Sequence, residues 1–101
     1  MSKEEIKLGI ERAMHDRKNH ELIKRIRLFG SFARGQAHEN SDVDLLIDFQ
    51  EAARVGFFEL HDIEESFRGH LKRTVDITTP GGLDHLIRDS ILSEAETVYE
   101  A

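Results

Sequence analysis

Residues 43–49 alternate between apolar and polar side chains, and this alternation is the strongest constraint that the sequence places on the fold. One face of the segment is apolar (Val43, Leu45, Ile47 and Phe49), and the other carries Asp42, Asp44, Leu46 and Asp48. Successive side chains of a strand point to opposite faces of a sheet, so a period of two marks a half-buried strand. The sequence therefore predicts a strand with one face in the core and carboxylates on the other.

Two shorter strands and several helices are expected around this central strand. Short runs of branched and aromatic residues predict strands at 26–29 and 74–78, and Val75 and Ile77 are expected to face the core. Residues 94–99 fit either a short edge strand or a frayed end. The predicted order is α-β-α-β-α-β-α, which indicates an α/β (α+β) fold with a small mixed sheet packed against helices.

Apolar residues at helical spacing predict the helices. The first begins after Ser2, its N-cap, and ends at the polar run 15–20. The second covers about 53–68 and is closed by Gly69. The last starts at Pro80 and is carried by four apolar residues: Leu83, Leu86, Ile87 and Ile91.

The composition limits where the protein works and what it binds. A chain of 101 residues without a linker or an internal repeat is expected to form one domain, residues 1–101. It has no cysteine, no apolar stretch long enough to cross a bilayer, and a charged start that is unlike a secretory signal. We therefore expect a cytoplasmic protein that does not associate with a membrane. The net charge of −6 argues against direct binding of nucleic acid, which requires a basic surface.

Three aspartates are candidates for metal binding and catalysis. Asp42 and Asp44 are two residues apart, so they project from the same face of the central strand. Asp76 lies on the polar side of the third strand, and the three carboxylates converge if the two strands are neighbours. Carboxylates held close together repel each other unless a cation lies between them, and Mg²⁺ binds through one or two carboxylates plus substrate phosphates. Three acids suit a two-metal site that assists an in-line displacement.

A Gly-Ser pair, Gly30 and Ser31, follows the strand predicted at 26–29. A glycine lets the backbone approach a phosphate closely. Residues 31–34 are expected to open a short helix whose free N–H groups favour an anion. The Ser31 hydroxyl and the Arg34 guanidinium, which has several donors, complete this expected phosphate site.

The remaining basic residues and histidines are expected at the surface. Arg68, Lys72 and Arg73 form the clearest basic cluster and are interpreted as a solvated helix end. The six histidines show no spacing typical of metal ligands.

Two motifs resemble the signature of the nucleotidyltransferase superfamily, which includes DNA polymerase β: Phe-Gly-Ser-Phe-Ala-Arg-Gly at 29–35 and Ser-Asp-Val-Asp-Leu-Leu-Ile at 41–47. With its short length, the chain is most similar to the minimal nucleotidyltransferases (the MNT family), over about residues 22–92. The resemblance implies that Gly30 and Ser31 bind the triphosphate, and Arg34 and Ser41 are further candidates for this nucleotide site. It also implies that Mg²⁺ is held by the catalytic residues Asp42, Asp44 and Asp76, and that Asp76 helps to activate the attacking hydroxyl.

The activity that the resemblance implies is transfer of AMP from ATP to an acceptor hydroxyl, with Mg²⁺ as cofactor. Many MNT proteins are antitoxins of a HEPN-domain ribonuclease toxin, and some adenylylate it on a tyrosine, so a HEPN toxin is the expected partner. One alternative is a small-molecule acceptor such as an aminoglycoside, although 101 residues leave none for an acceptor-binding domain. Another is a non-catalytic antitoxin that blocks its partner by binding, but such a module gains nothing from clustered acids that repel.

Overall fold

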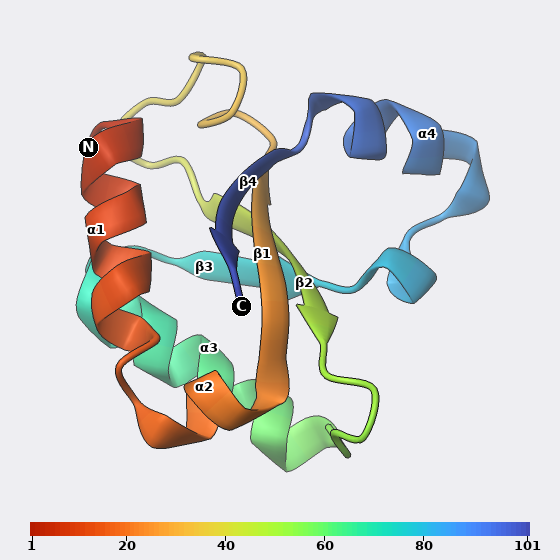
Figure 1. Cartoon of the computed structure of the whole chain (residues 1–101). Coiled ribbons are helices and arrows are strands. Elements are labelled where there is room, and N and C mark those ends of the chain that lie inside the picture. The colour runs from red at the N-terminus through yellow and green to blue at the C-terminus, as the bar shows by residue number, and fades with distance from the viewer.

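A mixed sheet of four strands in the order β3-β2-β1-β4 forms the centre of the computed structural model, which describes residues 1–101 (Figure 1). Strand β1 (Ile23–Phe29) is antiparallel to both β2 (Val43–Phe49) and β4 (Glu96–Glu100), whereas β3 (Val75–Thr78) is parallel to β2. The predicted small mixed sheet is confirmed, and the alternating segment is β2. The C-terminal segment, which the sequence left open, is an edge strand.

Helices cover one face of this sheet. Helix α1 (Lys3–Ala13) and helix α3 (Phe57–Leu71) contact each other and enclose the core with the apolar side of the sheet. The core is a cluster of 16 buried residues, to which the two helices and β2 contribute Ile6, Ile10, Ile63, Phe67, Val43, Leu45 and Ile47. The predicted α+β class, with helices packed against a small sheet, is therefore confirmed.

Helix α1 begins as its sequence predicts. Ser2 Oγ accepts a hydrogen bond from the Glu5 N–H (3.2 Å), and Glu5 Oε1 accepts one from the Ser2 N–H (3.0 Å). This reciprocal pair is a capping box, which satisfies two of the backbone donors that a helix start leaves free.

The polar run at 15–20, predicted only to end the first helix, contributes most of a second one, α2 (Arg17–Leu22). Its one buried residue is polar: the Asn19 amide donates to the Ala13 carbonyl and to Ser66 Oγ, both at 2.9 Å. A hydrophobic period cannot reveal such a helix. Strand β1 follows directly, three residues earlier than the predicted strand start.

Helix α3 is shifted toward the C-terminus relative to the helix predicted at 53–68. It begins at Phe57 and continues past Gly69 to Leu71. The C-cap is Lys72, whose φ of 56° is left-handed. Because Leu71 is buried in the core, the last turn stays helical and Gly69 does not end it. At 15 residues α3 is the longest helix, and none has the length and hydropathy needed to span a bilayer.

The C-terminal helix does not contribute to the core that its apolar residues suggest. Pro80–Gly82 forms only a short 3-10 turn, η1, and helix α4 (His85–Glu94) begins after Asp84. The Asp84 side chain caps it by accepting a hydrogen bond from the Leu86 N–H (2.9 Å). No residue of α4 is buried, and Leu86 is 81% exposed. In Figure 1, α4 stands apart from the other three helices.

Candidate active site

Asp44 and Asp76 lie side by side on neighbouring parallel strands. They are register partners in the β2–β3 ladder. Neighbouring strands are about 4.8 Å apart, and residues paired in register project from the same face of the sheet. This face is opposite to the core, because the residues on either side of Asp44, Val43 and Leu45, are buried. Asp42, two residues before Asp44, lies just ahead of β2, so the structure brings the three predicted acids to one end of these strands.

The surroundings of Asp44 raise the pKa of its carboxyl group to about 6. Burial is the largest cause, and the negative charges of Asp76 and Asp42 add to it. Arg34 acts in the opposite direction without offsetting them. None of the three aspartates forms an ion pair with a basic side chain. The cluster is therefore uncompensated negative charge, which favours a bound cation.

Gly30 is required at the end of β1 for two reasons. Its φ is +77°, a left-handed conformation that side chains with a Cβ disfavour. A Cβ added to Gly30 would also overlap the Asp44 carboxylate. The glycine thus allows the backbone turn and the Asp44 carboxylate to approach each other closely. The sequence predicted a glycine for close approach to a phosphate, and the structure adds close approach to Asp44.

The segment after Gly30 is a turn and not the short helix predicted at 31–34. The Arg34 N–H donates to the Gly30 carbonyl (3.1 Å), and the Gln36 N–H donates to the Ser31 carbonyl (2.9 Å). Gly35, with φ +71°, then reverses the chain. Two left-handed glycines therefore bound a tight turn. The N–H groups of Ser31, Phe32 and Ala33 within it donate no hydrogen bond to the protein. An anion here can be bound by single backbone donors and by Arg34.

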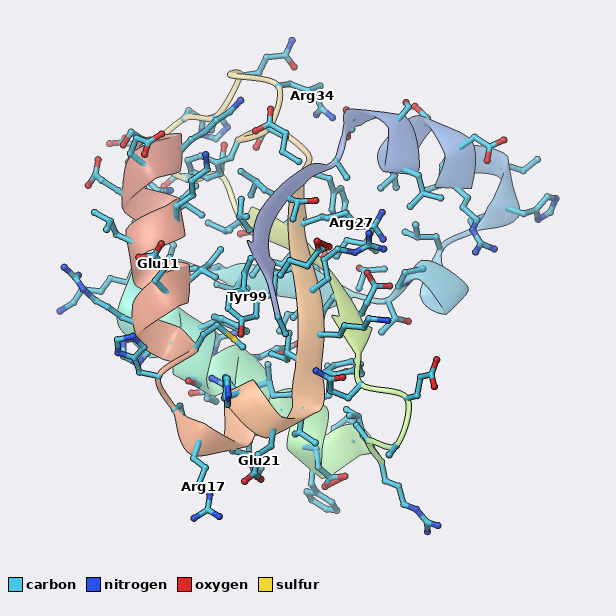
Figure 2. The ribbon with its side chains drawn as sticks, in the orientation of Figure 1. Glu11, Arg17, Glu21, Arg27, Arg34 and Tyr99 are labelled. Atoms are coloured by element: carbon cyan, nitrogen blue, oxygen red, sulfur yellow. The ribbon has the colours of Figure 1, made fainter.

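The Arg34 guanidinium contacts the carboxylate of Glu94, the last residue of α4. Arg34 Nη1 lies 3.1 Å from Glu94 Oε1 and 3.2 Å from Oε2. The Gly30 N–H donates to the same Oε1 at 3.3 Å. Figure 2 shows the Arg34 side chain reaching from the turn toward the junction of α4 and β4. No local sequence pattern points to Glu94, because 60 residues separate it from Arg34.

Ser41 lies in the loop that leads to Asp42. Its Oγ accepts a hydrogen bond from the His38 N–H (2.9 Å), and its own N–H donates to the His38 carbonyl (3.0 Å). The hydroxyl oxygen thus accepts one hydrogen bond that shapes the loop, and the hydroxyl hydrogen can still donate to a phosphate. Ser31, the other predicted serine, is partly exposed on the Gly30 turn.

The prediction that the basic cluster Arg68, Lys72 and Arg73 is a solvated helix end is wrong for Arg73. Its Nη1 donates to the carbonyls of Glu39 (2.8 Å) and Ser41 (3.1 Å). Its guanidinium also lies over the Phe32 ring, 5.3 Å from the centroid. Arg73 therefore connects the start of β3 to the loop before Asp42 and to the turn after Gly30. The partners are more than 30 residues away in sequence, so no local pattern could reveal this role.

Comparison of this chain with known proteins identifies its family. The profile of the nucleotidyltransferase domain family matches residues 10–98, which is most of the chain. The chain belongs to this family. Among relatives of this nucleotidyltransferase domain, the protein adenylyltransferase MntA of Thermococcus cleftensis is 37% identical over 73 residues, which are 71% of this chain and 71% of that protein. The predicted resemblance to the minimal nucleotidyltransferases is confirmed.

Solved structures agree with this assignment. A candidate minimal nucleotidyltransferase superimposes on the domain with a TM-score of 0.75 at 32% identity, covering 95% of both chains. A toxin-antitoxin complex with AMP-PNP gives a TM-score of 0.73 at 19% identity, covering 94% of this chain and 73% of the other. A complex of tri-AMPylated Shewanella oneidensis HEPN toxin with MNT antitoxin gives 0.65 at 14% identity, covering 95% and 71%. At such low identities, the last two establish a shared fold.

The acids of this nucleotidyltransferase domain fit a magnesium ion by their chemistry. Asp42, Asp44 and Asp76 supply carboxylate oxygens, the donors that Mg²⁺ prefers, and lack a protein cation of their own. They are not gathered into a ready three-ligand cluster. Such a cage is not required, because Mg²⁺ usually keeps several waters and binds through one or two carboxylates plus substrate phosphates. All six histidines are exposed, as predicted.

Proposed function

We propose that this chain is a protein adenylyltransferase that transfers AMP from ATP to a hydroxyl of a HEPN-domain toxin and thereby acts as its antitoxin. The observation that carries the proposal is the register pairing of Asp44 with Asp76 beside the Gly30 turn. The 37% identity to the protein adenylyltransferase MntA supports the type of acceptor. In this proposal residues 1–101 act as one domain in the cytoplasm, where ATP is available.

In the proposed reaction, the acceptor hydroxyl oxygen forms a bond to the α-phosphorus of ATP. The bond from that phosphorus to the bridging oxygen breaks, and pyrophosphate leaves. The hydroxyl proton passes to the Asp76 carboxylate and from there to water. Asp42 and Asp44, with Asp76, would hold Mg²⁺, which neutralises phosphate charge when bound. Gly30, Ser31, Arg34 and Ser41 would bind the triphosphate.

The open surroundings of the acids favour a protein acceptor over a small molecule. Asp42 and Asp76 are exposed, and none of the four cavities of the structure is lined by Asp42, Asp44 or Asp76. Sites for small molecules usually enclose most of their ligand. A hydroxyl on the surface of another protein can reach the exposed Asp76, and a large acceptor can supply the enclosing surface that this chain lacks around the acids.

The test is an AMP-transfer assay with the protein encoded beside this chain. ATP labelled on the α-phosphate is incubated with Mg²⁺, the chain and its neighbour, and the experiment is repeated with Asp42→Ala plus Asp44→Ala. A matched control, Glu51→Ala plus Glu100→Ala, removes the same number of charges at exposed positions without ion pairs. Circular dichroism checks that both variants fold.

The proposal expects label on the neighbour that disappears with the aspartate variant and persists with the control. Neutralisation of the toxin without label, surviving both substitutions, would instead support an antitoxin that acts by binding alone. Label on an added aminoglycoside and not on the protein would support the small-molecule alternative.

A further inference from the structure

The carboxylate of Glu94 occupies donors that also suit a phosphate. Arg34 presents one nitrogen to both carboxylate oxygens, at 3.1 and 3.2 Å, and the Gly30 N–H adds a longer contact at 3.3 Å. We propose that Glu94 is an internal substitute for a nucleotide phosphate, which a bound triphosphate displaces. The inference rests on the proposed function, because it assumes that the Gly30 turn receives the nucleotide.

The chemistry of the donors supports this exchange. Guanidinium groups bind carboxylates and phosphates through the same planar set of N–H donors, so one anion can replace the other. Arg34 has no other acidic partner. A phosphate that needs both Arg34 and the Gly30 N–H cannot bind while Glu94 remains on them.

The Glu94 carboxylate lies near other negative charges, and Arg34 is the cation that it contacts. The charge of Glu94 lies close enough to Asp44 to contribute to the raised pKa of that carboxyl group. Glu94 is also only about one-quarter exposed, at 24% for the side chain. A bound triphosphate would add negative charge beside it. Glu94 is therefore expected to leave when the phosphates arrive.

Little of the structure has to be broken for Glu94 to move. It is the last residue of α4, which has no buried residue and makes few contacts with the other elements. Figure 1 shows α4 joined to the sheet by η1 at one end and by β4 at the other. A change at the junction of α4 and β4 can withdraw the carboxylate without repacking the core.

A structural role for the same contact predicts the opposite result. If Glu94 only held Arg34 in the orientation that a phosphate needs, removing its charge would weaken nucleotide binding. Displacement predicts tighter binding, because the competing anion is lost. The sign of the effect therefore separates the two roles.

The experiment measures binding of a non-hydrolysable ATP analogue and of tripolyphosphate by calorimetry in the presence of Mg²⁺. Glu94→Gln keeps the shape of the side chain and removes its charge. Glu100→Gln changes the net charge equally at an exposed site without an ion pair and is the control. We expect Glu94→Gln to bind both probes about five-fold more tightly than the wild type and the control. Unchanged or weaker binding by Glu94→Gln would overturn the inference.

A double-mutant cycle with Arg34→Ala tests whether the effect passes through Arg34. Glu94→Gln should improve binding much less when Arg34 is already absent. An equal improvement in both backgrounds would reveal only a general charge effect and would also overturn the inference.

The same measurements separate this inference from the proposed function. Tighter binding by Glu94→Gln without AMP transfer to any protein would leave the inference standing and remove the proposed function. If the chain transfers AMP but its Glu94→Gln variant binds the probes no more tightly, the proposed function stands and the inference fails. If the wild-type chain binds neither the ATP analogue nor tripolyphosphate, both the inference and the proposed function fail.

Discussion

Asp44 and Asp76 lie side by side in register on β2 and β3, and neither carboxylate forms an ion pair with a basic side chain. Like charges so placed destabilise the folded state until a cation or a proton reaches them. The folded domain therefore loses unfolding free energy at the place where it is proposed to bind metal and nucleotide.

Asp44→Asn is expected to stabilise the domain at neutral pH. The pKa of Asp44 is about 6 in the folded state against an ordinary value of 3.8, so the folded state binds the proton more tightly than the unfolded state. The resulting stability is present below about pH 4 and is lost as the pH rises toward 6. Allowing for solvent screening at this half-buried site, we expect a gain of about 1 kcal/mol at pH 7.5. Urea unfolding of both proteins at pH 4.5 and 7.5 measures it. A gain of equal size at both pH values would contradict the assignment.

Mg²⁺ is expected to raise the melting temperature of the wild type and to have little effect on Asp44→Asn. At a concentration ten times its dissociation constant, a bound ligand stabilises by about 1.4 kcal/mol, which is several degrees for a domain of this size. Thermal unfolding at pH 7.5, with NaCl added to equal ionic strength as the control, provides the measurement. Equal shifts in both proteins would show that the ion binds elsewhere.

Gly30→Ala is expected to destabilise the domain more than Gly35→Ala. Both glycines have left-handed φ values, +77° and +71°, so both substitutions carry a backbone cost of about 1 kcal/mol. Only at Gly30 does the new Cβ overlap the Asp44 carboxylate, since nothing lies within 4 Å of a Cβ at Gly35. We expect a total loss of about 2–3 kcal/mol for Gly30→Ala, measured by urea unfolding. Equal losses would mean that the Asp44 contact relaxes freely.

Arg73→Ala is expected to loosen the loop that leads to Asp42. The substitution removes the hydrogen bonds to the Glu39 and Ser41 carbonyls, so backbone amides of 36–42 should exchange faster with solvent. AMP transfer should fall about ten-fold, because catalysis depends on the position of the carboxylate. Arg68→Ala, which removes only a surface pair with Glu65, is the matched control. Unchanged exchange in 36–42 would show that the loop does not depend on Arg73.

Asp48→Ala is expected to cost about 2 kcal/mol of unfolding free energy. Asp48 is the acceptor for Arg25 (2.8 Å) and for Arg27 (3.2 Å), whose side chain is only 15% exposed and whose Nε is already buried without a partner. Removing Asp48 leaves that guanidinium unpaired in a partly buried place. Asp62→Ala, which removes an exposed pair with Lys18, is expected to change stability little. Similar losses for the two variants would argue against the burial of Arg27.

The sequence was most informative where periodicity and chemistry coincide. The alternation at 43–49 predicted both β2 and the face on which Asp44 lies, and the polar side assigned to Asp76 agrees with the register of β3. Helix ends were predicted less well, because α2 is held by the amide of Asn19 and α3 is prolonged by burial of Leu71. These are tertiary contacts that no local window contains.

The sequence predicted that the three acids of the candidate site lie together, but it did not reveal the residues that contact the surrounding loop and turn. Gly30, Asp42, Asp44 and Asp76 belong to short motifs, and their chemistry could be argued from residue type. Arg73 contacts the loop before Asp42 from more than 30 residues away in the chain, and Glu94 contacts Arg34 from 60 residues away. The turn after Gly30 also resembled a helix start, since only the second left-handed glycine, Gly35, shows that the chain reverses.

The detachment of α4 from the core has a consequence for how such chains diversify. Because none of its residues is buried, substitutions on this helix escape the selection for folding stability that constrains α1 and α3. Substitutions along 85–93 are therefore expected to cost little unfolding free energy. A comparison of substitution rates between orthologues should find α4 to be the fastest-evolving helix of the domain.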